Sequence, residues 1–383
     1  MARNSTTWDW TLLLAAACLV VGAPSLIAGE PAEGKHDARR DKLAAALLEQ
    51  MEQHGVPGVG VAVFNDYAID WADGYGVLAI ESDAGVTPET RFQAASISKP
   101  VAAAAALKLA EQGKLDLDAE VNDVLASWKV PEGANIAKMP IQVRQLLSHT
   151  AGLTVHGFPG YAVDAKRPTL IEILDGTPPA NTGPIRPLIK PGYAFRYSGG
   201  GYTVLQQLLI DVTGQPFPEL MQQAVLGPLE MTHSTYEQPL PAEWASQAAS
   251  GHRPQKKPVA GKWHIYPEMA AAGLWTTPSD LARFAIDLSR CHAGEQGTLL
   301  SQQTAEEMLT AVRGNYGLGL AVQGEGETLR FSHGGANDGF RCLLMAYPAT
   351  GQGIALMTNS DTGDRIFTDI LKLAGQLYAW PKQ

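Results

Sequence analysis

Ser96 and Lys99 are the residues with the clearest capacity for chemistry, and they stand in "AASISKPVAAAAALKLA" (94–110). A spacing of three is about one helical turn, so the two side chains lie on the same side in α or 3₁₀ geometry. Ser98, next to Lys99, points about 100° away. A lysine buried among small side chains can act as a base towards a hydroxyl. The spacing therefore predicts Ser96, and not Ser98, as a nucleophile.

The position of this pattern at a helix start favours the same chemistry. Pro100 suits a first helical turn, so Ser96 falls at the helix mouth, where the dipole favours developing negative charge. Other hydrolase signatures are absent: we find no G-x-S-x-G, H-E-x-x-H or paired C-x-x-C. The nine histidines are scattered, so we expect no metal and no cofactor. Four-residue patterns also arise by chance, so S-x-x-K needs support from elsewhere in the chain.

Hydrophobic periodicity predicts strands at both ends of the chain. A helix is expected over 38–54, two strands over 55–66 and 67–80 with a turn at Asn65-Asp66, and a final helix over 364–379. Four more strands are expected over 316–323, 328–335, 339–351 and 353–361. Thr277 should cap another helix, with Pro278 in its first position and Asp280 closing a capping-box-like pair.

These elements predict an α/β (α+β) fold, in which an antiparallel sheet from both termini is flanked by helices. The α/β part should cover about 36–115 and 270–381, and a mostly helical part about 116–269. A cleft between them would be the natural site. Residues 156–195, with seven prolines, and the polar residues 237–262 are either functional loops or surface decoration. His156, Phe158 and Tyr161 at the start of the proline-rich loop are candidate pocket residues. Tyr266 and Glu268 in "YPEMAAAGL" are candidates to face the cleft, whereas Trp275 is expected in the core.

Two further segments give the S-x-x-K pattern its support. Tyr197 stands in "FRYSGGGYTVLQQLL", 101 residues after Ser96, and "SHGG" occupies 332–335. In this order and spacing they resemble the serine β-lactamase-related family of class C β-lactamases, D-Ala-D-Ala carboxypeptidases, D-aminopeptidases and family VIII esterases. "QLLSHTAGL" (145–153), "AAGLWTTPSDLARF" (271–284) and "NYGLGL" (315–320) are similar too. The resemblance covers about residues 40–378 and implies a β-lactamase/transpeptidase-like fold.

The resemblance also implies roles for individual residues. Ser96 would be acylated, Lys99 and Tyr197 would share the proton shuttle, and the backbone N–H groups of Ser96 and Ala336 would form the oxyanion hole. The strand His333-Gly334-Gly335 would line the cleft opposite the serine, because glycines allow a substrate backbone to approach closely. His149 in "SHTAG" is expected to be a structural loop residue.

The chain departs from the family's lactamases at two motifs. Gly199 stands where Y-x-N has asparagine, which removes an amide that can bind a substrate carbonyl. His333 and Gly334 replace the lysine and threonine of K-T-G, so a fixed cation and a hydroxyl are lost. His333 can supply charge only when protonated. These departures argue against efficient β-lactamase action but leave acyl transfer intact.

Together these features predict an exported serine hydrolase that cleaves small carboxylic esters or D-amino-acid amides. The alternatives are a class C-like β-lactamase acting on a β-lactam substrate and, from another class, a catalytically silent penicillin-binding or scaffold domain. The net charge is −10 without a basic run, so nucleic acid is not expected as a partner. The oligomeric state is left open.

Export is predicted from the N-terminal residues. The apolar stretch 11–23, preceded by Arg3, indicates a signal peptide over 1–28 and a periplasmic or secreted protein. Cys18 follows "AAA" as in a lipoprotein box, but the apolar run continues past it, which argues against lipidation. No other stretch is long enough for a transmembrane helix. Cys291 and Cys342 would remain, either paired or as two buried thiols.

Overall fold

The computed structural model describes residues 38–132 and 140–382, so the expected signal peptide and Cys18 lie outside the described residues. The helices are α1 (Ala38–His54), α2 (Ser98–Glu111), α3 (Val121–Val124), α4 (Val143–Leu147), α5 (Leu170–Asp175), α6 (Gly199–Thr213), α7 (Phe217–Met221), α8 (Met269–Ala272), α9 (Pro278–Ala293), α10 (Gln302–Met308) and α11 (Phe367–Leu377). The strands are β1 (Gly58–Asn65), β2 (Ala68–Gly76), β3 (Phe92–Gln93), β4 (Tyr161–Ala162), β5 (His252–Arg253), β6 (Lys257–Pro258), β7 (His264–Ile265), β8 (Trp275–Thr276), β9 (Ala321–Gln323), β10 (Arg330–Asn337), β11 (Phe340–Tyr347) and β12 (Gln352–Thr358).

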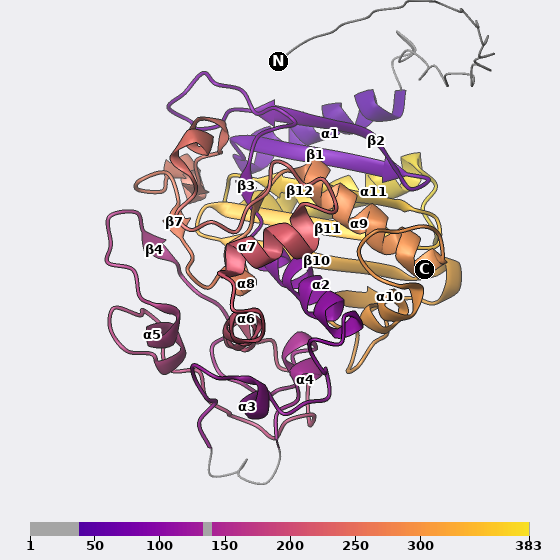
Figure 1. Cartoon of the computed structure of the whole chain (residues 1–383). Coiled ribbons are helices and arrows are strands. Elements are labelled where there is room, and N and C mark those ends of the chain that lie inside the picture. The colour runs from indigo at the N-terminus through magenta and orange to yellow at the C-terminus, as the bar shows by residue number, and fades with distance from the viewer. Residues whose placement is uncertain (1–37, 133–139, 383) are drawn as a thin grey trace, which may run out of the picture. The chain divides into compact units, whose positions relative to one another are not determined.

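One six-stranded antiparallel sheet organises the described chain, in the order β2-β1-β12-β11-β10-β9. The N-terminal hairpin β1-β2 pairs with the C-terminal meander through β1 and β12, so the sheet is built from both ends of the chain (Figure 1). The predicted antiparallel sheet from both termini is therefore confirmed. Helices α3 to α8 lie in the sequence between the two halves.

Alternation along the strands places this sheet between two layers of helices. Val61 and its partner Leu356 face the layer of α1 and α11, whereas the next pair, Ala62 and Ala355, faces the layer that contains α2 and α9. The stripe on α1 that covers the first face consists of Leu43, Leu47 and Met51, spaced four residues apart as the sequence predicts.

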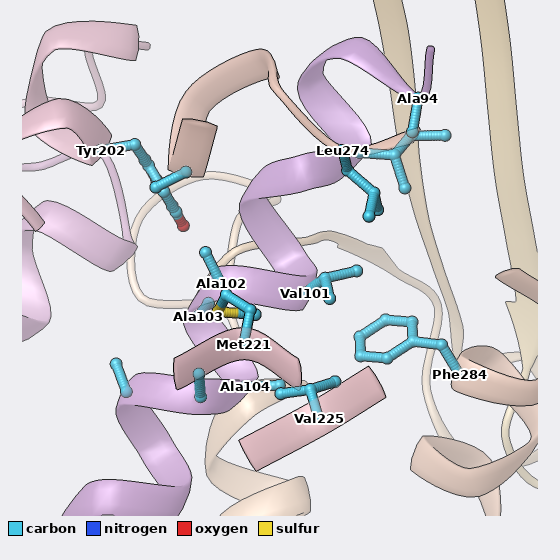
Figure 2. Close-up of a cluster of buried hydrophobic side chains, with 14 of the residues drawn as sticks. Ala94, Val101, Ala102, Ala103, Ala104, Tyr202, Met221, Val225, Leu274 and Phe284 are labelled. Atoms are coloured by element: carbon cyan, nitrogen blue, oxygen red, sulfur yellow. The ribbon is translucent and has the colours of Figure 1, made fainter. Parts of the chain in front are cut away.

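Helix α2 runs through the centre of the second layer, and all of its residues from Ser98 to Leu107 are buried. Its small side chains allow other helices to come close. Figure 2 shows the alanines of α2 surrounded by large side chains from three helices. These are Tyr202 of α6, Met221 of α7 and Phe284 of α9. The alanine run is thus a packing requirement, and it fixes the position of the residues at the start of α2.

The expected strand over 316–323 is wrong in its first five residues, because only Ala321–Gln323 is a strand. Gly319 has φ +101°, which a strand residue does not adopt. A Cβ at this position would lie 2.8 Å from the Cβ of Ala103 and 3.2 Å from the Cα of Pro100. Close packing of the backbone against α2 therefore displaces the strand and turns Tyr316 towards the interior.

Helix α9 begins as predicted, but one detail of its start differs. Thr277 caps the helix by accepting a hydrogen bond from the N–H of Asp280, and Pro278 is the first helical residue. The expected capping-box pair is not formed. The Asp280 carboxylate instead accepts hydrogen bonds from the N–H of His233 and the hydroxyl of Ser234. It ties a distant loop to the helix rather than closing its own cap.

Two remaining expectations concern the cysteines and membrane spans. Cys291 and Cys342 are both free thiols, and both are buried. In the part of the chain described here, no helix has the length and apolar character needed to cross a membrane.

Candidate active site

Ser96 and Lys99 are in contact at the start of α2. Ser96 belongs to the 3₁₀ helix η1 (Ala95–Ile97), which leads directly into α2. The Nζ of Lys99 donates to the Oγ of Ser96 at 3.1 Å and to the carbonyl oxygen of Ala271, in α8, at 2.7 Å. Lys99 is 2% exposed, whereas Ser96 is partly exposed. The amine is therefore held inside the protein and the hydroxyl is presented at its surface.

Ser98 has a different environment, because both hydrogen-bonding capacities of its hydroxyl are used internally. Its Oγ donates to the carbonyl oxygen of Ala95 at 2.5 Å and accepts from the N–H of Leu274 at 2.9 Å. Ala95 has φ +50°, an unfavourable value for an alanine. The Ser98 hydroxyl thus stabilises the strained turn that carries Ser96. Ser98 is fully buried.

Tyr197 reaches the same place from the segment that precedes α6. The centroid of its ring lies 5.0 Å from the Nζ of Lys99. Ser198 caps α6 by accepting a hydrogen bond from the N–H of Gly201, which fixes where the helix begins. Ser96 and Lys99, predicted from one motif, and Tyr197, predicted from another, are therefore brought together by the fold.

His333 on β10 completes this group, and its surroundings keep it neutral. Its Nε2 is 3.2 Å from the hydroxyl of Tyr316, and its Nδ1 is 2.7 Å from the carbonyl oxygen of Gly334. Burial, and secondly the charge of Lys99, lower the pKa of His333 to about 3. The imidazole is thus uncharged at neutral pH and does not replace the lysine of K-T-G as a fixed cation.

Beyond Ser332, one edge of β10 has no pairing strand among the described residues, and it lies beside η1. Strand β9 pairs with β10 only from Arg330 to Ser332, while β11 pairs with the other edge as far as Asn337. Gly334 and Ala336 are exposed. A Cβ at Gly335 would lie 2.3 Å from the carbonyl oxygen of Ala94. This glycine therefore allows β10 to approach the serine turn closely.

Gly199, the departure from Y-x-N, is covered by the proline-rich loop. A Cβ at Gly199 would lie 3.0 Å from the ring of Phe158 and 3.1 Å from the carbonyl oxygen of His156. The exposed ring of His156 is centred 4.9 Å from that of Tyr197. Both loop residues thus border the site, and Phe158 fills space that a side chain at 199 would need.

Three aromatic residues around this site were not predicted from the sequence. The ring of His149 is centred 4.2 Å from that of Tyr197 and 5.0 Å from that of Tyr316. The ring of Tyr202 lies 5.8 Å from the Nζ of Lys99. His149 was expected to be structural. Its motif "SHTAG" was the available signal, whereas no spacing rule indicates Tyr202 or Tyr316.

The remaining residues singled out in the sequence are buried. Trp275 is in the core as expected, against the rings of Trp263 and Phe340. Tyr161 and Glu268 contact each other at 3.5 Å and are buried. Burial raises the pKa of Glu268 to about 7. Tyr266 is fully buried, and its hydroxyl accepts from the N–H of Asp338.

Lys99 has no ion-pair partner among the described residues. Among the described residues, no carboxylate lies within 4 Å of its Nζ; the contacts are a hydroxyl, a carbonyl oxygen and the faces of two tyrosine rings. Nor do three or more His, Cys, Asp or Glu side chains gather as metal ligands in residues 38–132 and 140–382. The contact between the amine of Lys99 and the hydroxyl of Ser96 can carry a proton from one to the other, which is a step of serine acyl transfer.

The fold is the β-lactamase/transpeptidase-like fold of the structural relatives reported below. The profile of the family described as Beta-lactamase matches residues 43–377, so the chain belongs to that family. This confirms the resemblance stated from the sequence motifs.

Individual proteins are similar over most of the chain. Penicillin-binding protein 4 of Amycolatopsis lactamdurans is 28% identical over 346 residues, covering 85% of this chain and 87% of its own. The octameric penicillin-binding protein homologue from Pyrococcus abyssi has a TM-score of 0.73 at 24% identity, covering 88% of this chain and 77% of that one. EstCE1, a hydrolase with promiscuous acyltransferase activity, has a TM-score of 0.69 at 20% identity, covering 89% and 98%. These structures share the fold.

Proposed function

We propose that this protein is an exported serine hydrolase that cleaves small carboxylic esters or D-amino-acid amides through an acyl-enzyme on Ser96. The observation that carries the proposal is the 3.1 Å contact between the Nζ of Lys99 and the Oγ of Ser96. A buried amine without a carboxylate partner is well suited to exchange a proton with that hydroxyl. The apolar segment 11–23 supports export.

The reaction proceeds in two halves. The Oγ of Ser96 bonds to the acyl carbon while its proton passes to Lys99 and Tyr197, which share the role of base. The pair then returns a proton to the departing alcohol or amine. Water attacks the acyl-enzyme, the acid is released and Ser96 regains its proton. The N–H groups of Ser96 and Ala336 are proposed to hold the oxyanion in both halves.

Two features favour esters over β-lactams. His333 is neutral at neutral pH, so this position supplies no positive charge to a substrate carboxylate. The ring of Phe158 lies against Gly199, at the position of the lactamase asparagine. The proposed substrate is therefore a small acyl compound whose recognition does not depend on a carboxylate at His333.

A substrate panel tests this proposal. We expect kcat/KM for p-nitrophenyl butyrate to exceed that for nitrocefin, with a D-alanyl p-nitroanilide as the third substrate. Ser96→Ala should abolish turnover, while Ser246→Ala, an exposed serine elsewhere, should not. If nitrocefin is the equal or better substrate, the protein is a β-lactamase. If all three are inert and a fluorophosphonate does not label Ser96, it is a silent domain.

A further inference from the structure

The phenol of Tyr197 has no hydrogen bond of its own within the described residues, so other contacts must fix its position. The neighbours of Tyr197 on both sides are held by one residue, His149. The N–H of Arg196 donates to the carbonyl oxygen of His149 at 2.8 Å. The N–H of Ser198 donates to the Nδ1 of His149 at 3.1 Å. The imidazole also lies 4.2 Å from the ring of Tyr197, tilted by 38°.

The backbone of His149 is adapted to making both bonds. It has φ +56°, in the left-handed region that residues other than glycine, asparagine and aspartate seldom occupy. In this conformation its carbonyl group and its side chain both reach the segment 196–198. His149 is 2% exposed, which leaves the ring little freedom. Strained residues of this kind persist when the surrounding structure holds them and are frequent at functional sites.

We infer that His149 is a positioning residue, which sets the Tyr197 phenol relative to Lys99 and Ser96 by holding the backbone on both sides of it. This inference rests on the proposed function, because it assigns His149 a part in the same proton shuttle. His149 acts through Tyr197 and not on the substrate, since its Nδ1 is occupied by the N–H of Ser198 and its Nε2, which has no partner among the described residues, is buried.

The ring must be neutral for this role, because only an unprotonated Nδ1 can accept a hydrogen bond. The structure favours the neutral form. Burial, followed by the charges of Lys99, His333 and His156, lowers the pKa of His149 well below its usual range. No carboxylate faces the ring; the described side chains around it are those of Lys99, Phe195, Tyr197, Tyr202, Tyr316, His156 and His333. The bond to Ser198 should therefore persist over the working pH range.

A double-mutant cycle between His149 and Tyr197 tests the inference. The rate of Ser96 modification by a fluorophosphonate is measured for the wild type, His149→Phe, Tyr197→Phe and the double variant. His149→Phe keeps a ring but removes the acceptor. We expect it to slow modification at least tenfold in the wild-type background and less than twofold in the Tyr197→Phe background. With p-nitrophenyl butyrate, the loss should fall on kcat while KM changes less than twofold.

Equal losses in both backgrounds would overturn the inference while leaving the proposed function standing. If Ser96 of Tyr197→Phe is modified as fast as that of the wild type, both the inference about His149 and the proposed function fail. Because phenylalanine is strained at φ +56°, His149→Asn serves as a second variant. Asparagine tolerates this φ, and its amide oxygen can accept from Ser198. If neither variant retains a cooperative thermal transition, His149 is a folding residue and the inference is wrong.

Discussion

Relative to the wild type, the free energy of unfolding of Glu268→Gln should increase from acid to alkaline pH. Glu268 is fully buried before α8, and its Oε1 lies 3.5 Å from the hydroxyl of Tyr161. Its Oε2 has no partner in the described structure. Burial disfavours the carboxylate and raises its pKa to about 7. A glutamine has a similar shape but never carries this charge.

The size of the effect follows from linkage between protonation and folding. The pKa of Glu268 rises from 4.5 in the unfolded chain to about 7, and this difference, at about 1.4 kcal/mol for each pH unit, corresponds to about 3.5 kcal/mol. Because the folded-state pKa is the higher one, this stabilisation is fully present below pH 4.5. It is lost as pH rises to 7 and is absent above it. Glu268→Gln should remove this slope.

Urea unfolding of the wild type and Glu268→Gln at pH 5, 6, 7 and 8 measures this directly. The difference in unfolding free energy between them should increase by about 2–3 kcal/mol in favour of glutamine from pH 5 to pH 8. The amide nitrogen of glutamine would also lack a partner. This cost is the same at every pH, so it does not change how the difference in unfolding free energy depends on pH. Glu89→Gln, at an exposed position, is the matched control and should follow the wild type. Parallel curves for Glu268→Gln and the wild type would refute the reasoning.

Three further outcomes are expected. Lys99→Met should lower kcat at least 10²-fold with an equal or higher Tm, because an apolar side chain enters a buried site; near-normal turnover by the folded variant would remove Lys99 from the mechanism. Peptide mapping after fluorophosphonate treatment should place the adduct on Ser96, and an adduct on Ser98 would contradict the assignment. Gly335→Ala should lose activity or folding, because its Cβ would lie 2.3 Å from a carbonyl oxygen. Gly334→Ala, whose Cβ would have its nearest contact at 3.8 Å, should fold normally. Circular dichroism melts of the two variants can show this difference.

Local features of the fold were predictable from the sequence because they depend on periodicity and caps. The helix Ala38–His54, the hairpin β1-β2 and the Thr277 cap of α9 follow from spacing and residue type alone. The strand expected from residue 316 failed because its course depends on packing against α2, which no local pattern encodes. Periodicity thus predicts an element only where tertiary contacts do not override it.

In the candidate site, too, local contacts could be predicted from the sequence and long-range contacts could not. The contact between Ser96 and Lys99 lies within one helical turn and could be predicted from spacing. The approach of Tyr197 had to be inferred from family resemblance, because 101 residues separate it from Ser96. The motif "SHTAG" predicts only a structural loop residue at His149. Its importance to Tyr197 depends on a left-handed backbone and two long-range hydrogen bonds, neither of which is visible in a sequence.

The contact between Phe158 and Gly199 has an evolutionary consequence. An asparagine introduced at 199 must share space with the Phe158 ring, 3.0 Å from its Cβ. Gly199→Asn alone should therefore be neutral or harmful, and beneficial for β-lactam hydrolysis only after Phe158 has become small. The order of the two substitutions then matters, which is sign epistasis. Under the proposed function, this loop separates the protein from lactamase activity by a step that selection does not favour until the loop has changed.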